Sequence, residues 1–134
     1  MKIPHFISKA VLTMVLSTIS VSVFAHGATV TPLMKKQLTR LDNKEGTMLI
    51  VEYAPGMSSE KHRHDAHIFA YVLEGAVTMQ VEGGEPVTLT AGDTFYESPE
   101  DIHLVSKNAS PTAPAKMVVF SLTEKNAPIV IPVK

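Results

Sequence analysis

Three of the six histidines in this 134-residue chain fall within six positions, in the stretch HRHDAHIFAYVLEG (residues 62–75). His62 and His64 are two residues apart, so on an extended strand their side chains project from the same face and can converge on one ion. Imidazole nitrogens suit Fe, Zn, Cu and Ni, whereas Mg²⁺ and Ca²⁺ prefer oxygen ligands. The spacing therefore indicates a divalent transition-metal site, although an isolated H-x-H pair also fits a polar loop that enters a strand.

The residues around these histidines form short β-rich runs separated by Pro and Gly, which is the pattern of a sandwich or barrel. The clearest alternation places Val77, Met79 and Val81 on one face of a strand. The sequence therefore predicts an all-β domain, in which only residues 32–43 have a helix as an alternative to an edge strand. The predicted strands are residues 47–54, 67–74, 76–82, 86–90, 93–97, 103–107, 116–123 and 129–133.

The first 25 residues have the features of a cleavable signal peptide. Lys2 and Lys9 form a positive region before a mostly apolar run of about 13 residues, which is short of the roughly 20 that a membrane span needs. Val23 and Ala25 put small residues at the positions that a signal peptidase reads. We therefore expect cleavage after Ala25, a single domain over residues 26–134, and a periplasmic or secreted protein with no membrane span.

Charge and composition exclude several classes of function. Removing Lys2 and Lys9 leaves 10 basic and 13 acidic residues, so the formal charge changes from −1 to −3. No basic run remains that could follow a nucleic-acid backbone or an anionic membrane, so nucleic acid is not an expected partner. The chain has no cysteine, which excludes thiolate metal sites and disulfides.

Two segments resemble the conserved motifs of the cupin superfamily. PGMSSEKHRHDAHIFAYVLEG matches the first motif at Gly56, His62, His64 and Gly75, and AGDTFYESPEDIHLVSKN matches the second from Gly92 to its histidine. The motifs cover residues 56–75 and 92–108. The resemblance, which is to small exported cupins with a single domain, implies a double-stranded β-helix (a small jelly-roll barrel) and a homodimer. It also implies that His62, His64 and His103 bind the metal.

The match fails where the first motif has a metal-binding glutamate, because that position falls on Ile68, or on Phe69 with the longer spacing of the motif, and neither can bind a metal. His67 is adjacent, and a short turn at 65–66 would bring it inward, since a one-residue slip moves a side chain across the sheet. The alternative places His67 beside the barrel mouth or at a subunit contact. Its role as a fourth ligand is therefore contested. The second motif also departs from the pattern, because its asparagine position is Lys107, with Asn108 one residue later.

Other residues are candidates for the surroundings of the ion. Glu97 would reach the metal or hydrogen-bond to one of its ligands, with a solvated strand end as the alternative. Tyr53 and Tyr71 are candidates for the pocket, because a phenol can orient a bound molecule, although most aromatic residues in a small domain belong to the core. The sequence assigns no catalytic residue and no residue for binding any other cofactor.

Two functions follow from a metal-binding cupin. The first is a metal-dependent enzyme of dioxygenase, isomerase or decarboxylase type, acting on a small oxygen-rich molecule that chelates the open face of the ion. The second is a non-catalytic periplasmic protein that binds a metal or a small ligand. A three-histidine site beside a deep pocket with a titratable group would favour the enzyme, and a closed four-ligand site would favour the binding protein.

Overall fold

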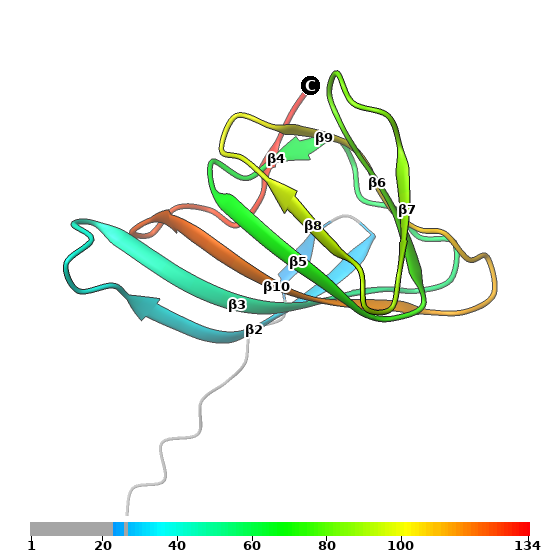
Figure 1. Cartoon of the computed structure of the whole chain (residues 1–134), viewed down its shortest axis with the longest axis horizontal. Helices are drawn as coiled ribbons and strands as arrows, with labels where there is room; N and C mark the ends of the chain where they lie inside the picture. The colour runs from blue at the N-terminus through cyan, green and yellow to red at the C-terminus, as the bar shows by residue number, and fades with distance from the viewer. Residues whose placement is uncertain (1–22, 26) are drawn as a thin grey trace, which may run out of the picture.

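The computed structural model describes residues 23–25 and 27–134, which form two antiparallel sheets that face each other (Figure 1). One sheet has the strand order β1-β2-β3-β10-β5-β8 and the other the order β11-β4-β9-β6-β7. This architecture confirms the predicted all-β double-stranded β-helix. No helix in the described part of the chain is long and apolar enough to cross a membrane. The strands are β1 (Val23–Ala25), β2 (Ala28–Gln37), β3 (Lys44–Tyr53), β4 (His62–Arg63), β5 (His67–Glu74), β6 (Ala76–Val81), β7 (Val87–Thr90), β8 (Thr94–Glu97), β9 (Ile102–Asn108), β10 (Ala115–Glu124) and β11 (Ile131–Pro132).

Alternation of inward and outward side chains builds both sheets. In β5, Ile68, Ala70 and Val72 are buried while their neighbours along the strand are exposed. The same period of two runs through β10, where Met117 and Val119 face the interior. These positions meet the buried side chains of β6 from the second sheet, and together they form one apolar core. Burial of this set is the main force that closes the barrel.

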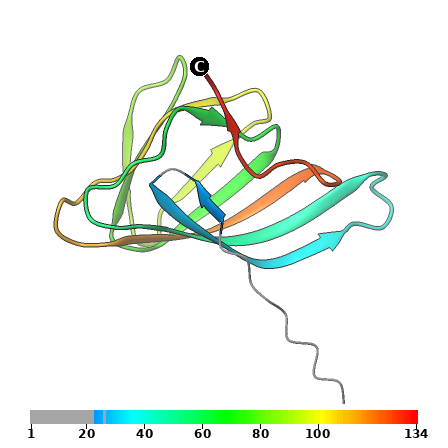
Figure 2. The same ribbon diagram turned by 180° about the vertical axis from the view of Figure 1, so that it is seen from behind.

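Three strands, β1, β2 and β4, differ from the predicted set. Residues 32–37 belong to β2, so the helix is wrong and the strand alternative is correct. β4 has only two residues, too few for any pattern to reveal, and it pairs with β9 on one side and β11 on the other. Figure 2 shows the C-terminal segment that carries β11 crossing the side of the barrel beside β4. β4 is therefore held in place by partners from distant parts of the chain.

The asparagine of the second motif closes one end of the barrel. Asn108, rather than Lys107, points inward, and its amide nitrogen donates to the carbonyl oxygens of Tyr53, Ala54 and Ala113. Its side-chain oxygen accepts a hydrogen bond from the backbone N–H of Ser110. One buried side chain thus joins the end of β3 to the loop before β10.

The glycine that ends the first motif is required by close packing as well as by its backbone conformation. Gly75 has φ +72°, and a Cβ there would lie 2.4 Å from the carbonyl oxygen of Pro114 and 3.0 Å from the Cα of Ala115. Gly56, the first glycine of the same motif, also has φ +72°, but a Cβ there would meet nothing within 4 Å. A comparison of substitutions at the two glycines therefore distinguishes the energetic cost of the left-handed backbone from the cost of a steric clash.

Alanine substitutions at these two glycines should have unequal effects on stability. Gly56→Ala should lower the free energy of unfolding by about 1 kcal/mol, because an L-residue in the left-handed region costs roughly 1–2 kcal/mol. Gly75→Ala should lower it by about 3 kcal/mol or more, because overpacking adds to the same conformational cost. Urea denaturation followed by circular dichroism measures both values. Equal losses would contradict the close approach of the chain at Gly75.

Candidate metal centre

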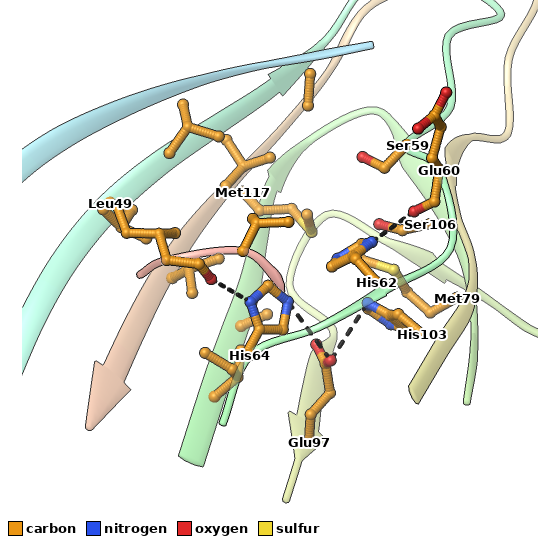
Figure 3. A pocket seen from close by; sticks show the side chains of 18 of the residues that line it. Leu49, Ser59, Glu60, His62, His64, Met79, Glu97, His103, Ser106 and Met117 are labelled. Atoms are coloured by element: carbon orange, nitrogen blue, oxygen red, sulfur yellow. Dashed lines mark hydrogen bonds and ion pairs between the residues drawn. The ribbon is translucent and has the colours of Figure 1, made fainter. Parts of the chain in front are cut away.

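The structure brings three histidines from two strand regions to one place on the inner face of the barrel. His62 lies on β4 and is paired directly with His103 on β9, while His64 follows β4 immediately. The ring centroids are 4.8 Å apart for His62 and His64, 5.2 Å for His62 and His103, and 6.2 Å for His64 and His103. One ligand nitrogen from each ring lies within 4.8 Å of the others. The three side chains converge, as Figure 3 shows.

Backbone carbonyls fix the orientation of two of these rings. The Nδ1–H of His62 donates to the carbonyl oxygen of Glu60 at 2.7 Å, and that of His64 donates to the carbonyl oxygen of Ile129 at 2.6 Å. A carbonyl oxygen only accepts, so each Nδ1 carries the proton and each Nε2 keeps a free lone pair. This arrangement is typical of histidines that bind a metal through Nε2.

His103 is buried without any hydrogen-bond partner. Its side chain is 3% exposed, the ring of Phe95 stacks on it at 5.8 Å, and neither ring nitrogen forms a hydrogen bond. Buried polar atoms without partners are rare and costly, at about 1–3 kcal/mol for each group. A metal ion held by His62, His64 and His103 would satisfy one of these nitrogens. The residues present therefore fit a transition-metal ion.

In the part of the chain that the structure describes, Glu97 has the one carboxylate that forms an ion-pair contact with these imidazoles. Its side chain is 5% exposed, and its Oε2 lies 3.2 Å from Nδ1 of His103 and 3.8 Å from Nε2 of His64. Oε2 has no hydrogen-bond partner in the described structure. The alternative that Glu97 is a solvated strand end is therefore wrong, because Glu97 is opposite Ile68 of β5 and its side chain is buried in the interior.

Burial shifts the pKa of each of these groups in the direction that favours its neutral form. Desolvation raises the pKa of Glu97 to about 8, with a smaller contribution from the charge of Asp101. Desolvation lowers the pKa of His64 to about 4, and desolvation together with His62 and His64 lowers the pKa of His103 to about 3. Neutral imidazoles are the form that binds a metal, and a bound cation would reverse the penalty on the carboxylate.

Two of the sequence candidates lie outside this group. His67 is exposed on the outer face of β5, and its Nδ1 is 2.8 Å from the hydroxyl of Tyr96. The turn at Asp65, which has φ +44°, does not reverse the alternation, so Ile68 faces inward in its place. Tyr71 is 45% exposed on the same outer face. The structure therefore brings neither residue to the histidines.

Tyr53 does line the interior, but its hydroxyl is already engaged. The hydroxyl lies 2.8 Å from Oγ of Ser59 and 2.6 Å from Oγ of Ser106. Burial is the main cause of the raised pKa of its phenol. Tyr53 thus links β3 to the segment that precedes β4 and to β9, and it supports the wall of the site.

The histidines and Glu97 face a cavity of about 400 Å³ between the two sheets. Most of its wall is apolar, and the segment 128–132 forms one side of it. Sequence reasoning missed this segment as part of the site, because no motif or spacing marks it. The apolar side chains of the wall come from Ala28, Val30, Leu49, Val51, Ile68, Ala70, Met79, Met117, Val119, Pro128, Ile129, Val130 and Pro132.

Comparison with known families places this fold and site among the cupins. The family described as Cupin domain matches residues 49–121, which is more than half of the chain and contains all three histidines and Glu97. The chain therefore belongs to the cupin family. No curated protein matches the chain closely enough in sequence to support a more specific assignment.

Solved structures show the same fold at low sequence identity. A double-stranded β-helix protein from Klebsiella pneumoniae is similar with a TM-score of 0.62 and 19% identity, over 88% of this chain and 99% of that chain. The polyketide cyclase RemF from Streptomyces resistomycificus has a TM-score of 0.62 and 19% identity, over 92% and 87%. The DMSP lyase DddQ from Ruegeria pomeroyi has a TM-score of 0.57 and 18% identity, over 66% and 43%. At these identities the similarity establishes the fold alone.

Elemental analysis of alanine variants should identify the ligands. Protein reconstituted with Zn²⁺ should hold about one ion per chain. Each of the variants His62→Ala, His64→Ala and His103→Ala should weaken zinc binding by at least about 100-fold. Loss of a residue that only hydrogen-bonds to a ligand costs about 10–100-fold, so loss of a ligand should cost at least as much. His67→Ala is the matched control and should keep the ion, since His67 faces outward. Loss of zinc from His67→Ala in a folded protein would contradict the arrangement described above.

Proposed function

We propose that this protein is an exported cupin metalloenzyme that acts on a small molecule in the interior of its barrel. The observation that carries the proposal is the convergence of His62, His64 and His103 on the wall of a cavity large enough for a small molecule. These three residues would hold one Fe, Zn, Cu or Ni ion. When bound, such an ion supplies Lewis acidity or redox chemistry to the oxygen atoms of a coordinated molecule.

Catalysis is favoured over simple capture of a metal or ligand. His67 does not close the site, so three histidines leave coordination positions that face the cavity. Glu97 adds a buried carboxyl group to the same wall, beside His64 and His103. Similar folds include a polyketide cyclase and a DMSP lyase. A periplasmic protein that only binds a metal or ligand is the second candidate, and dioxygenase, isomerase and decarboxylase reactions all stay open.

The cavity wall favours a molecule with an apolar body and one oxygen-bearing end, rather than one rich in oxygen throughout. Among the described residues of the wall, Lys61 has the single cationic side chain, since burial keeps the histidines neutral. The hydroxyls of Tyr53, Ser59 and Ser106 bond to one another, which reduces their capacity to bind a polyol. Most of the bound molecule would therefore contact apolar side chains, while its oxygen atoms meet the metal.

Two probes distinguish these kinds of molecule. Protein loaded with Zn²⁺ should bind catechol, which has an aromatic body and two adjacent oxygens, at least about tenfold more tightly than gluconate, a difference of about 1.4 kcal/mol. Ala70→Leu, which fills part of the cavity wall, should weaken catechol binding without loss of zinc, whereas Ala113→Leu on an exposed loop should not. Titration calorimetry measures these affinities. Tighter binding of gluconate would contradict an apolar substrate.

Export is part of the proposal and rests on the sequence of residues 1–25. Residues 1–22 lie outside the described part of the structure, and β1 occupies Val23–Ala25 as a short strand paired with β2. Cleavage after Ala25 would remove β1. It would leave Ala28 and Val30, the buried residues at the start of β2, in the mature chain. The core and the histidine site would therefore be complete in residues 26–134.

The outer face of the larger sheet supports the proposed homodimer. Met48, Phe120, Phe69 and Tyr96 are cross-strand neighbours in successive pairs along one row, and each is between 38% and 51% exposed. With Tyr71 they present roughly 400 Å² of surface, since a large aromatic side chain has about 150–250 Å² to bury. A stable dimer buries about 800 Å² on each partner. This row would form the apolar centre of an interface with a second copy.

Native mass spectrometry of protein from a periplasmic fraction tests both export and assembly. The expected species is a dimer of chains that begin at His26, with one metal ion per chain. Phe69→Glu should produce a monomer that keeps its metal, because Phe69 points away from the histidines. A chain that retains residues 1–25 would contradict cleavage, and a wild-type monomer at micromolar concentration would contradict the dimer.

A further inference from the structure

The position of the missing glutamate has a specific neighbour in the structure. Ile68 on β5 occupies that position of the first motif, and its partner in the antiparallel register with β8 is Glu97. Directly opposed residues on neighbouring strands project from the same face, with Cβ atoms about 4.5–5.5 Å apart. Both side chains are buried and both line the cavity. A carboxylate from Glu97 therefore enters the site beside the place where one from position 68 would enter.

The contacts of Glu97 are unusual for a buried residue that serves only packing. Its Oε2 has no hydrogen-bond partner, and 3.8 Å away lies Nε2 of His64, which keeps its lone pair because Nδ1 donates to Ile129. Both of these atoms accept hydrogen bonds, so neither can satisfy the other unless a proton or a cation lies between them. His103, 3.2 Å from the same oxygen, also lacks a partner. The unsatisfied atoms of Glu97 and His103 and the lone pair of His64 thus lie close to one another.

Charge favours a cation at that point. Three neutral imidazoles leave the charge of a divalent ion uncompensated, and Glu97 would be the one anionic group in contact with His64 and His103. Asp101, whose charge contributes to the raised pKa of Glu97, accepts a hydrogen bond from the backbone N–H of Ser98. Glu97 would therefore reduce the net charge of the site from two to one.

We propose that Glu97 is the carboxylate ligand of this metal site. It lies on β8 and takes the place of the glutamate that the first motif would have at position 68 on β5. The inference rests on the proposed metal site and adds to it a fourth ligand that comes from the second motif instead of the first. The ion is then held by three histidines and one glutamate, although the strand that usually supplies the glutamate supplies an isoleucine. His67 has no part in the site.

A strand-to-strand exchange tests this proposal. Glu97→Gln keeps the shape of the side chain and removes its charge, and it should weaken the binding of Co²⁺ by at least about tenfold. Glu97→Ile should weaken it as much or more, and the double variant Ile68→Glu/Glu97→Ile should return the affinity to within about tenfold of wild type. Titration calorimetry gives the affinities, and the visible absorption of bound Co²⁺ reports the change of ligand. Glu100→Gln, in an exposed turn, is the matched control.

The outcomes separate the two levels of the proposal. If wild-type protein binds no Co²⁺ or Zn²⁺, the proposed metalloenzyme fails together with this inference. If wild type binds the ion and folded Glu97→Gln binds it equally well with an unchanged spectrum, the metal site stands and Glu97 is not a ligand. If Glu97→Ile loses the ion and the exchange does not restore it, the two positions are not equivalent and Glu97 does not take the place of a glutamate at position 68.

Discussion

The antiparallel pairing of β4 with β9 is the constraint on which the candidate site depends. It sets His62 directly opposite His103 and so brings the two sequence motifs, about 40 residues apart, to one wall of the barrel. β4 itself contributes only two residues of strand, and it is fixed by β9 on one side and by β11 on the other. Because both partners come from distant segments, the site is complete only when the whole barrel has closed.

Polar groups inside the closed barrel are shielded from water, so they need hydrogen-bond or metal partners within the protein. Carbonyl oxygens of Glu60 and Ile129 fix the rings of His62 and His64, whereas His103 and one oxygen of Glu97 have no partners in the described structure. Burial favours neutral imidazoles, which are able to bind a metal, and it penalises a free carboxylate. A single cation would satisfy one nitrogen of His103 and the unpaired oxygen of Glu97, and it would favour the charged form of the carboxylate. The electrostatics of the site and the proposed chemistry therefore have the same physical origin.

Most of the fold could be predicted from the sequence because it depends on local alternation. The alternation of residues 76–82, together with the short β-rich runs between Pro and Gly, predicted most of the strands that form the core, and the structure places the motif histidines together. β4 is too short to show a period, and residues 128–132 have no pattern that would place them against the cavity. The choice between a helix and a strand for residues 32–37 was settled only by pairing with β3.

The surroundings of the histidines could not be predicted with the same success, because they depend on register. The orientation of His67 follows from whether the turn at Asp65 adds or removes a residue, which composition does not reveal. The burial of Glu97 depends on its pairing with Ile68 across β5 and β8, a contact between residues 29 positions apart. Tyr71 is of a residue type that suits a pocket, but its position in β5 places its side chain on the outer face. Sequence spacing thus identified candidate ligands within a motif, whereas it left open whether Glu97 is buried beside them.

The most direct test of the central claim is the anomalous diffraction of crystals of the protein grown with Zn²⁺ and measured on both sides of the zinc absorption edge. The account predicts one strong anomalous peak per chain inside the barrel, in contact with His62, His64 and His103 and with the carboxylate of Glu97. Absence of a peak at this point, or a peak bound at His67 on the outer face, would contradict it.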